Sequence, residues 1–110
     1  GDLVRAGECY RESLEMRQRL GQLPGVAWSM EGLGEVALLS CDGRRAVRLW
    51  AAAARLRRES HDQLTDVDAK QFDEWQEKMR AALGEENYRQ AWAAGESLSL
   101  EEAVAHALEE

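Results

Sequence analysis

Apolar residues recur at intervals of three and four positions along almost the whole chain, and no stretch alternates apolar and polar residues convincingly. The first spacing places side chains on one face of an α-helix, whereas alternation would indicate a strand. The pattern therefore predicts six helices on short connections and leaves no room for a sheet. The expected apolar faces are, in chain order, Leu3, Ala6, Tyr10, Leu14 and Leu20; Val26, Met30, Leu33 and Ala37; Ala46, Leu49, Trp50, Ala53 and Leu56; Phe72, Trp75, Met79 and Leu83; Tyr88, Ala91 and Trp92; and Leu100, Val104 and Leu108.

Turn and capping residues set the expected helix boundaries. Gly21 ends a first helix over 2–20. Pro24 suits the first turn of a second helix that ends near residue 40, because the missing amide proton of proline costs nothing there. The other expected boundaries are a turn at 41–43, a loop at 59–64, an N-cap at Thr65, and helix ends at Gly84 and Gly95.

The last helix begins with a recognisable capping motif. Ser99 is followed three positions later by Glu102. The serine oxygen would accept a hydrogen bond from the Glu102 amide, and the Glu102 carboxylate would reach back to the serine amide. The motif predicts a capping box at the start of this helix.

An internal repeat links the first and third helices at a distance of 40 positions. The matched pairs are Asp2 and Asp42, Arg5 and Arg45, Ala6 and Ala46, Tyr10 and Trp50, Ser13 and Ala53, and Arg17 and Arg57. A fixed period on paired helices is typical of a solenoid, in which each helical hairpin buries its apolar face by stacking on a neighbour.

Small and aromatic residues within this repeat resemble the tetratricopeptide pattern. Leu33 and Gly34, followed by Ala37, look like the signature of a first helix. Ala46, Trp50 and Ala53 then look like the small, aromatic and small positions of a second helix. Gly32 and Gly34 would each cost about 1 kcal/mol in an isolated helix. We expect close packing of a partner helix to offset that cost.

Two longer stretches extend the resemblance to one group of proteins. Residues 19–37 (RLGQLPGVAWSMEGLGEVA) resemble the repeats of large bacterial signalling and transcriptional regulators, and residues 81–109 (AALGEENYRQAWAAGESLSLEEAVAHALE) look like their carboxyl terminus. In that group a nucleotide-binding ATPase module, often with a LuxR-type or related DNA-binding domain or a cyclase domain, is joined to the repeat array.

The resemblance implies an all-α, right-handed helical array that is a fragment of an α-solenoid with carboxyl-terminal capping helices. Its expected parts are repeat helices over 1–58, with the first repeat truncated, a loop over 59–65, and a helical cap of the same domain over 66–110. The chain opens in the middle of a repeat, at what should be a second helix. An uncovered apolar face on that helix would favour association.

Charge and composition exclude several classes of protein. The net charge of −7 argues against a general nucleic-acid binder, because affinity for a duplex depends on neutralising phosphates. The longest apolar run, residues 49–54, is far too short to cross a membrane. The chain lacks a starting methionine and an apolar signal region, so we expect a cytoplasmic fragment of a longer protein.

Catalytic and metal-binding patterns are not recognised in the sequence. Cys9 and Cys41 are expected to be reduced structural residues, because two cysteines make no disulfide framework in a chain with this much potential core and neither has a second cysteine at metal-ligand spacing. His61 and His106 lie far apart, and each is expected to have an incidental surface role. The glutamates are scattered over helix faces, and no phosphate-binding loop or nucleophile elbow is present. We therefore expect a protein without catalysis, cofactor or metal.

The family pattern places one face of the second helix on the concave side of the array. On that face an aromatic ring flanked by carboxylates offers contact area to a peptide at low entropic cost. Packing of the two tryptophans between repeats is the alternative and is favoured, more strongly for Trp75. The expected groove residues are Trp28, Glu31, Glu35 and Leu38, which a shift of 40 positions carries to Asp68, Gln71, Trp75 and Lys78.

Six arginines concentrate positive charge on the third helix. A site for an anion, a nucleic acid or an acidic partner is one interpretation. They are spread around the helix and acidic residues are plentiful, so a solvated face with intramolecular ion pairs is favoured. The six are Arg44, Arg45, Arg48, Arg55, Arg57 and Arg58.

These patterns together favour a non-catalytic module that binds another protein or another domain of its parent chain. A structural cap or self-association element is the second hypothesis, with homo-association through Leu3, Tyr10 and Leu14 of the first helix. A small-molecule sensor pocket between helices is the third.

Overall fold

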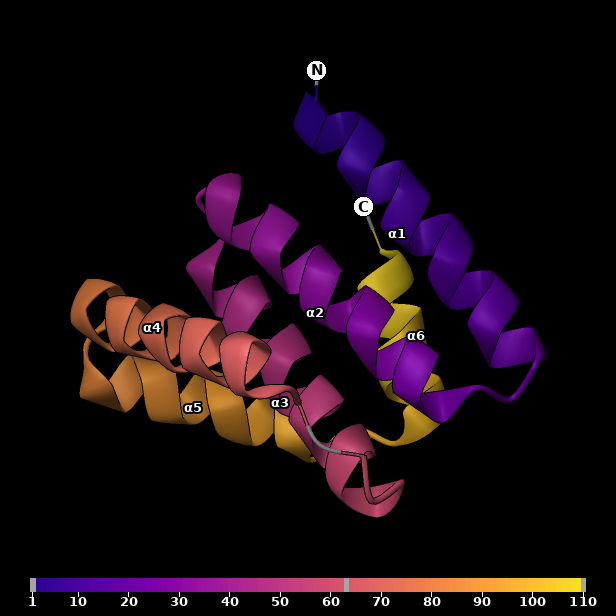
Figure 1. The fold of residues 1–110 in the computed structure, drawn as a ribbon. Coiled ribbons are helices and arrows are strands. Elements are labelled where there is room, and N and C mark those ends of the chain that lie inside the picture. Colours follow the sequence, from indigo (N-terminus) through magenta and orange to yellow (C-terminus); the bar gives the residue numbers. More distant parts are fainter. Residues whose placement is uncertain (1, 63, 110) are drawn as a thin grey trace.

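Six α-helices carry almost the whole chain in the computed structural model, which describes residues 2–62 and 64–109 (Figure 1). No strand occurs in those two ranges, as the apolar spacing predicts. The predicted helices are all present. Their bounds are α1 (Asp2–Arg19), α2 (Leu23–Leu39), α3 (Gly43–Glu59), α4 (Asp66–Leu83), α5 (Glu85–Glu96) and α6 (Leu100–Leu108).

Capping residues begin several helices as the sequence predicts. Pro24 lies in the first turn of α2. The Thr65 hydroxyl accepts a hydrogen bond from the Asp68 amide at the start of α4. Ser99 and Glu102 form both hydrogen bonds of the capping box of α6. These side chains satisfy amides that have no partner within the helix.

The first three helices end in the same way at intervals of 20 residues. Gly21, Cys41 and His61 have φ angles of 70°, 64° and 54°. This left-handed conformation commonly terminates helices and favours glycine, so Cys41 and His61 adopt it at a steric cost. The hydrogen bonds that close the three turns run from Gln22 N to Arg17 O, Asp42 N to Ala37 O, and Asp62 N to Arg57 O.

Helix α3 lies at the centre of the fold and packs most extensively on α2 and α5 (Figure 1). All five apolar positions predicted for it are buried, and so are Val47, Ala51 and Ala52. One face of α3 contributes to a core shared with α1, α2 and α6. The opposite face contributes Trp50 to a second core shared with α4 and α5.

Two glycines let aromatic rings lie directly against the backbone of α2. A Cβ atom at Gly32 would overlap the Tyr10 ring of α1, and one at Gly34 would overlap the indole of Trp50 on α3. Close packing therefore accounts for both glycines, as we expected. Because Tyr10 and Trp50 occupy matched positions of the repeat, α2 receives equivalent rings from its two neighbours.

Gly95 does not end α5, contrary to our expectation. It is buried inside the helix, which continues to Glu96. A Cβ atom at Gly95 would overlap the backbone carbonyl of Arg48 on α3. The glycine is thus a contact point at which two helix backbones meet, and its role depends on a residue 47 positions away.

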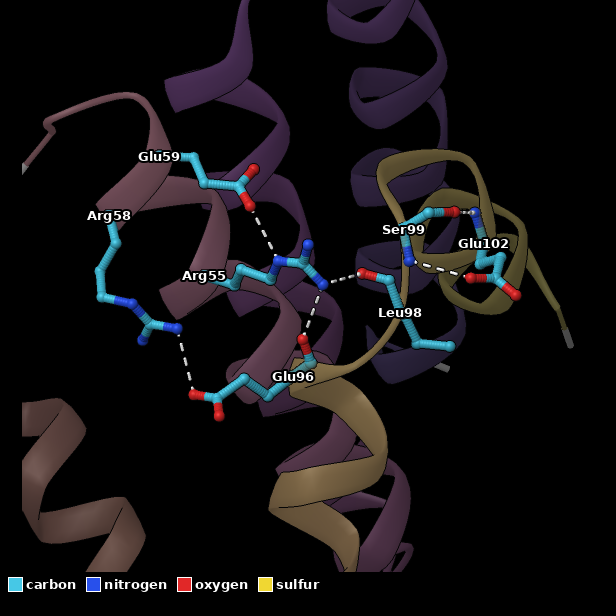
Figure 2. A network of polar contacts seen from close by, with 7 residues as sticks. All are labelled: Arg55, Arg58, Glu59, Glu96, Leu98, Ser99 and Glu102. Atoms are coloured by element: carbon cyan, nitrogen blue, oxygen red, sulfur yellow. Dashed lines mark hydrogen bonds and ion pairs between the residues drawn. The ribbon is translucent and has the colours of Figure 1, made fainter.

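Arg55 of α3 holds the connection between α5 and α6 (Figure 2). Its Nη1 donates to the carbonyl oxygens of Glu96 at 2.9 Å and Leu98 at 3.0 Å. Its Nε donates to the Glu59 carboxylate at 2.8 Å. Helix ends leave carbonyl groups without partners, and here a cationic side chain from another helix satisfies them.

Arg45 binds the carbonyl groups at the end of α6 in the same way. Its Nη2 donates to the carbonyl oxygens of His106, Ala107 and Glu109 at 3.0, 3.3 and 2.8 Å. A guanidinium at a helix carboxyl terminus also complements the helix dipole. Arginines of α3 therefore fix both ends of the carboxyl-terminal segment.

Helix α6 returns to the beginning of the chain, where it contacts α1, α2 and α3 (Figure 1). Its buried residues are Ala103, Val104 and Ala107, which join the core around Leu14 and Met30. In a simple repeat array each unit contacts only its sequence neighbours. The position of α6 is therefore a long-range feature that closes the first core.

Replacing Gly95 by alanine should lower the free energy of unfolding by about 3 kcal/mol, because the added methyl meets backbone that cannot rotate away. The matched control is Ala94→Gly at an exposed position of the same helix, which should cost about 1 kcal/mol through helix propensity alone. Urea unfolding of both variants measures the difference. A Gly95→Ala variant as stable as the parent chain would contradict the packing described here.

Candidate protein-binding groove

A pocket of about 130 Å³ opens between α2 and α4, with one wall completed by α1. It brings together three of the predicted residues of α2 with three residues of α4, which lie 40 positions further along the chain. The residues that line it are Tyr10, Trp28, Glu31, Gly32, Glu35, Leu64, Asp68, Gln71, Phe72 and Trp75.

Two predicted groove residues lie outside this pocket. Leu38 is half-buried and packs against the second core. Lys78 is exposed on α4 and does not line the pocket. Both lie three residues beyond the last residue that lines the pocket on their helix, Glu35 on α2 and Trp75 on α4.

Trp28 presents half of its surface to solvent, with 50% of the residue exposed. Its ring lies 5.4 Å from the ring of Tyr10, measured between centroids. The guanidinium carbon of Arg17 lies 5.7 Å from the same centroid. Neighbouring side chains therefore hold the indole in place while much of it stays accessible.

Trp75 has a mainly structural contact. Its ring stacks on the buried Trp50 with centroids 5.2 Å apart and planes inclined by 12°. This is the packing that we favoured for Trp75. The half-buried residue also lines the pocket, so core and groove share this side chain.

Glu31 is engaged in an ion pair within the molecule. Both of its carboxylate oxygens accept hydrogen bonds from Arg57 of α3, each at 2.7 Å. Arg57 also pairs with Asp62. The hydrogen bond to Glu31 is the main cause that raises the pKa of Arg57. Glu31 lines the pocket as predicted, but its charge is already compensated by Arg57.

Glu35 and Asp68 carry the remaining carboxylates of the pocket. They lie on opposite walls, on α2 and α4. Across residues 2–62 and 64–109, neither carboxylate forms an ion pair with a cationic side chain. These two groups give the pocket its net negative charge.

Tyr10 and Phe72 were not predicted as groove residues. Both belong to apolar stripes that the sequence pattern assigns to the core. The signal for Tyr10 was the pair of glycines in α2, since a helix that carries no side chain at Gly32 admits a ring there. Phe72 gave no comparable signal, because its partner Trp50 is distant in sequence.

Five of the six arginines of α3 make side-chain contacts inside the molecule. Besides the contacts of Arg45, Arg55 and Arg57, the Arg58 guanidinium pairs with the Glu96 carboxylate at 3.1 Å. Arg48 donates to the imidazole of His106. The intramolecular ion pairs favoured by the sequence are observed for Arg55, Arg57 and Arg58. Arg45 binds backbone carbonyls and Arg48 binds an imidazole, which no sequence pattern indicated.

His106 is not an incidental surface residue, and that expectation is corrected. Its Nε2 accepts a hydrogen bond of 3.3 Å from Arg48 Nε, which places the ring proton of the neutral imidazole on Nδ1. Burial lowers the pKa of His106, and Arg45 and Arg48 lower it further against the opposing charges of Glu109 and Asp42. His61, by contrast, is exposed in the loop after α3.

The exposed apolar surface of α1 differs from the expected one. Leu14 is completely buried and Tyr10 is half-buried, so of the three expected residues only Leu3 is exposed. The α1 faces pack on α2 and α6, which the sequence could not place. The other exposed apolar side chains of α1 are Val4 and Met16, and Leu20 is exposed in the turn that follows the helix.

Metal-ligating groups do not gather in the part of the chain that the structure describes, where no cluster of three or more His, Cys, Asp or Glu residues could hold an ion. Cys9 and Cys41 are exposed and unpaired. Over the same residues, none of the helices has both the length and the apolar character needed to cross a bilayer.

A second, more open hollow of about 530 Å³ lies between the end of α3 and the start of α4. Arg57 and Arg58 line it, but their charges are matched by Glu31, Asp62 and Glu96. This balance gives the hollow no strong preference for a charged ligand.

Glu31→Gln should lower the free energy of unfolding by about 2 kcal/mol, because it leaves the largely buried Arg57 guanidinium without its main charged acceptor. Glu35→Gln is the matched control on the same helix and should change it by less than about 0.5 kcal/mol. Chemical denaturation of both variants provides the measurement. Equal effects of the two substitutions would refute a structural role for Glu31.

The lowered pKa of His106 predicts a dependence of stability on pH. The unfolded chain, with a histidine pKa of about 6.5, binds more protons than the folded chain between the two pKa values. The free energy of unfolding therefore falls as the pH drops from the histidine pKa of the unfolded chain toward the lower pKa of His106 in the folded chain. Melting temperatures from about pH 8 to about pH 5 should fall more steeply for the parent chain than for His106→Gln. Parallel curves for the two proteins would rule out this contribution.

Comparisons of the chain with protein-family models, with curated proteins and with solved structures found no match. A function for this chain is therefore inferred from the geometry of its own residues.

Proposed function

We propose that this chain is a non-catalytic interaction module that binds a segment of another protein, or of another domain of its parent chain, in the groove between α2 and α4. The observation that carries the proposal is the pocket itself. It combines the half-exposed indole of Trp28 with the unpaired carboxylates of Glu35 and Asp68. A rigid aromatic ring beside polar groups is the composition of many binding hot spots.

The architecture proposed for the module is a short, right-handed, tetratricopeptide-like array. Support comes from the matched packing of Tyr10 and Trp50 on the two glycines of α2 and from the turns that recur every 20 residues. In such an array α2 and α4 are the first helices of successive hairpins, so the groove between them would be its concave surface. Helix α6 would act as the closing element.

The proposed setting is a bacterial transcriptional or signal-transduction regulator in the cytoplasm. Residues 19–37 and 81–109 carry the resemblance on which this proposal rests. Within such a parent, the groove would hold either a signalling partner or the parent's own nucleotide-binding module. No cofactor is needed for either role.

A selection of peptides displayed on phage tests the groove. Binding of the selected peptides, measured by fluorescence anisotropy, should weaken at least about tenfold in Trp28→Ala and in Glu35→Arg, as hot-spot substitutions do. Glu35 replaces Glu31 in this design because Glu31 stabilises the fold.

Leu39→Ala is the matched control, since Leu39 is an apolar residue of α2 outside the pocket and is at least as exposed as Trp28 (58% against 50%). All variants should retain the helical circular dichroism of the parent chain. The proposed groove would be refuted if no peptides are selected. It would also be refuted if the affinities change in Leu39→Ala and stay unchanged in the Trp28 and Glu35 variants.

A further inference from the structure

The composition of the pocket points to the chemistry of what it holds. We propose that the pocket anchors the cationic head of an arginine or lysine side chain from the bound segment. This inference deepens the proposed function and rests on it. The occupant is a positively charged side chain of a protein partner.

Aromatic side chains from three helices line the pocket. Tyr10 comes from α1, Trp28 from α2, and Phe72 and Trp75 from α4. The faces of aromatic rings attract guanidinium and ammonium groups, most strongly in tryptophan, and rings that gather around one space form a cation-binding cage. The pocket therefore has the walls that an organic cation prefers.

An intramolecular contact already uses this property. Arg17 holds its guanidinium over the ring of Trp28, 5.7 Å from the centroid. Arg17 does not line the pocket, so it approaches the indole from outside and leaves the interior free. Trp28 is thus oriented by one cation at the edge of a space that could receive another.

The charges of the lining residues select for a cation. Glu31 is neutralised by Arg57, whereas Glu35 and Asp68 stay uncompensated on opposite walls. No lysine, arginine or histidine belongs to the described lining. An anionic ligand would therefore meet two like charges and no counter-charge, while a guanidinium could also donate to the amide oxygen of Gln71.

The size of the pocket favours one side chain over a free metabolite. Sites that enclose small-molecule ligands usually measure roughly 300–1,000 Å³, and this pocket measures about 130 Å³. The head of one long side chain can enter such a space while the backbone that carries it stays in the open groove. The preference of the pocket for a cationic side chain would then determine which partner segments bind in the groove.

Three small probes test the inference: N-acetyl-arginine amide, N-acetyl-lysine amide and the neutral N-acetyl-citrulline amide. The readout is the set of indole N–H resonances of the ¹⁵N-labelled chain, with Trp28 assigned from Trp28→Phe. The two cations should shift the Trp28 and Trp75 signals saturably, with dissociation constants on the order of millimolar. Citrulline amide should bind at least about fivefold more weakly.

A double substitution, Glu35→Gln with Asp68→Asn, should weaken the arginine probe about fivefold, as expected for the loss of two partly exposed charge pairs. The control, Glu12→Gln with Glu77→Gln, removes the same charge at exposed positions outside the pocket and should leave the affinity unchanged.

Equal binding of arginine and citrulline probes, or equal losses in both double variants, would overturn the cation anchor. The proposed groove would survive that result if the selected peptides still depend on Trp28. Conversely, peptides that bind without regard to Trp28 would remove the groove as a protein-binding site, even if the arginine probe shifted its resonance.

Discussion

The indole of Trp50 can lie against α2 only because residue 34 carries no side chain. This contact sets the separation of α2 and α3, the pair on which the two cores depend. The buried indole N–H has no hydrogen-bond partner in residues 2–62 and 64–109. Leaving such a group unpaired costs about 1–3 kcal/mol. Packing of the ring between α2, Phe72 and Trp75 must outweigh that cost.

Helix α3 also positions the carboxyl-terminal half of the chain. Helix α3 lies close enough to α5 for Gly95 to touch the Arg48 backbone, which carries the end of α5 within reach of Arg55. Arg45 then receives the end of α6. Most guanidinium groups of α3 are engaged in such contacts, since unpaired carbonyl groups and carboxylates are strong hydrogen-bond acceptors for them. The arginines that make α3 look basic in the sequence therefore serve mainly to join helices within the molecule.

The candidate groove is a consequence of the same packing. Stacking on Trp50 holds Trp75 and, through it, α4 opposite α2. The ion pair of Glu31 with Arg57 removes one carboxylate from the pocket and leaves Glu35 and Asp68 to determine its charge. The function proposed for the pocket thus depends on which acidic groups the fold leaves unpaired, a property of the assembled helices.

Local chemistry in the sequence determined the six helices, their caps and most of the buried positions, because turns, capping residues and apolar spacing act between residues close in the chain. Most groove residues of α2 and α4 could also be predicted from the sequence, since a 40-residue period relates them. Tertiary structure alone decided the role of Gly95, the return of α6 to α1, the burial of His106 and the pairing of Glu31. Each joins positions at least 26 residues apart, and the outcome of such a contact depends on how whole helices pack, which no local pattern records.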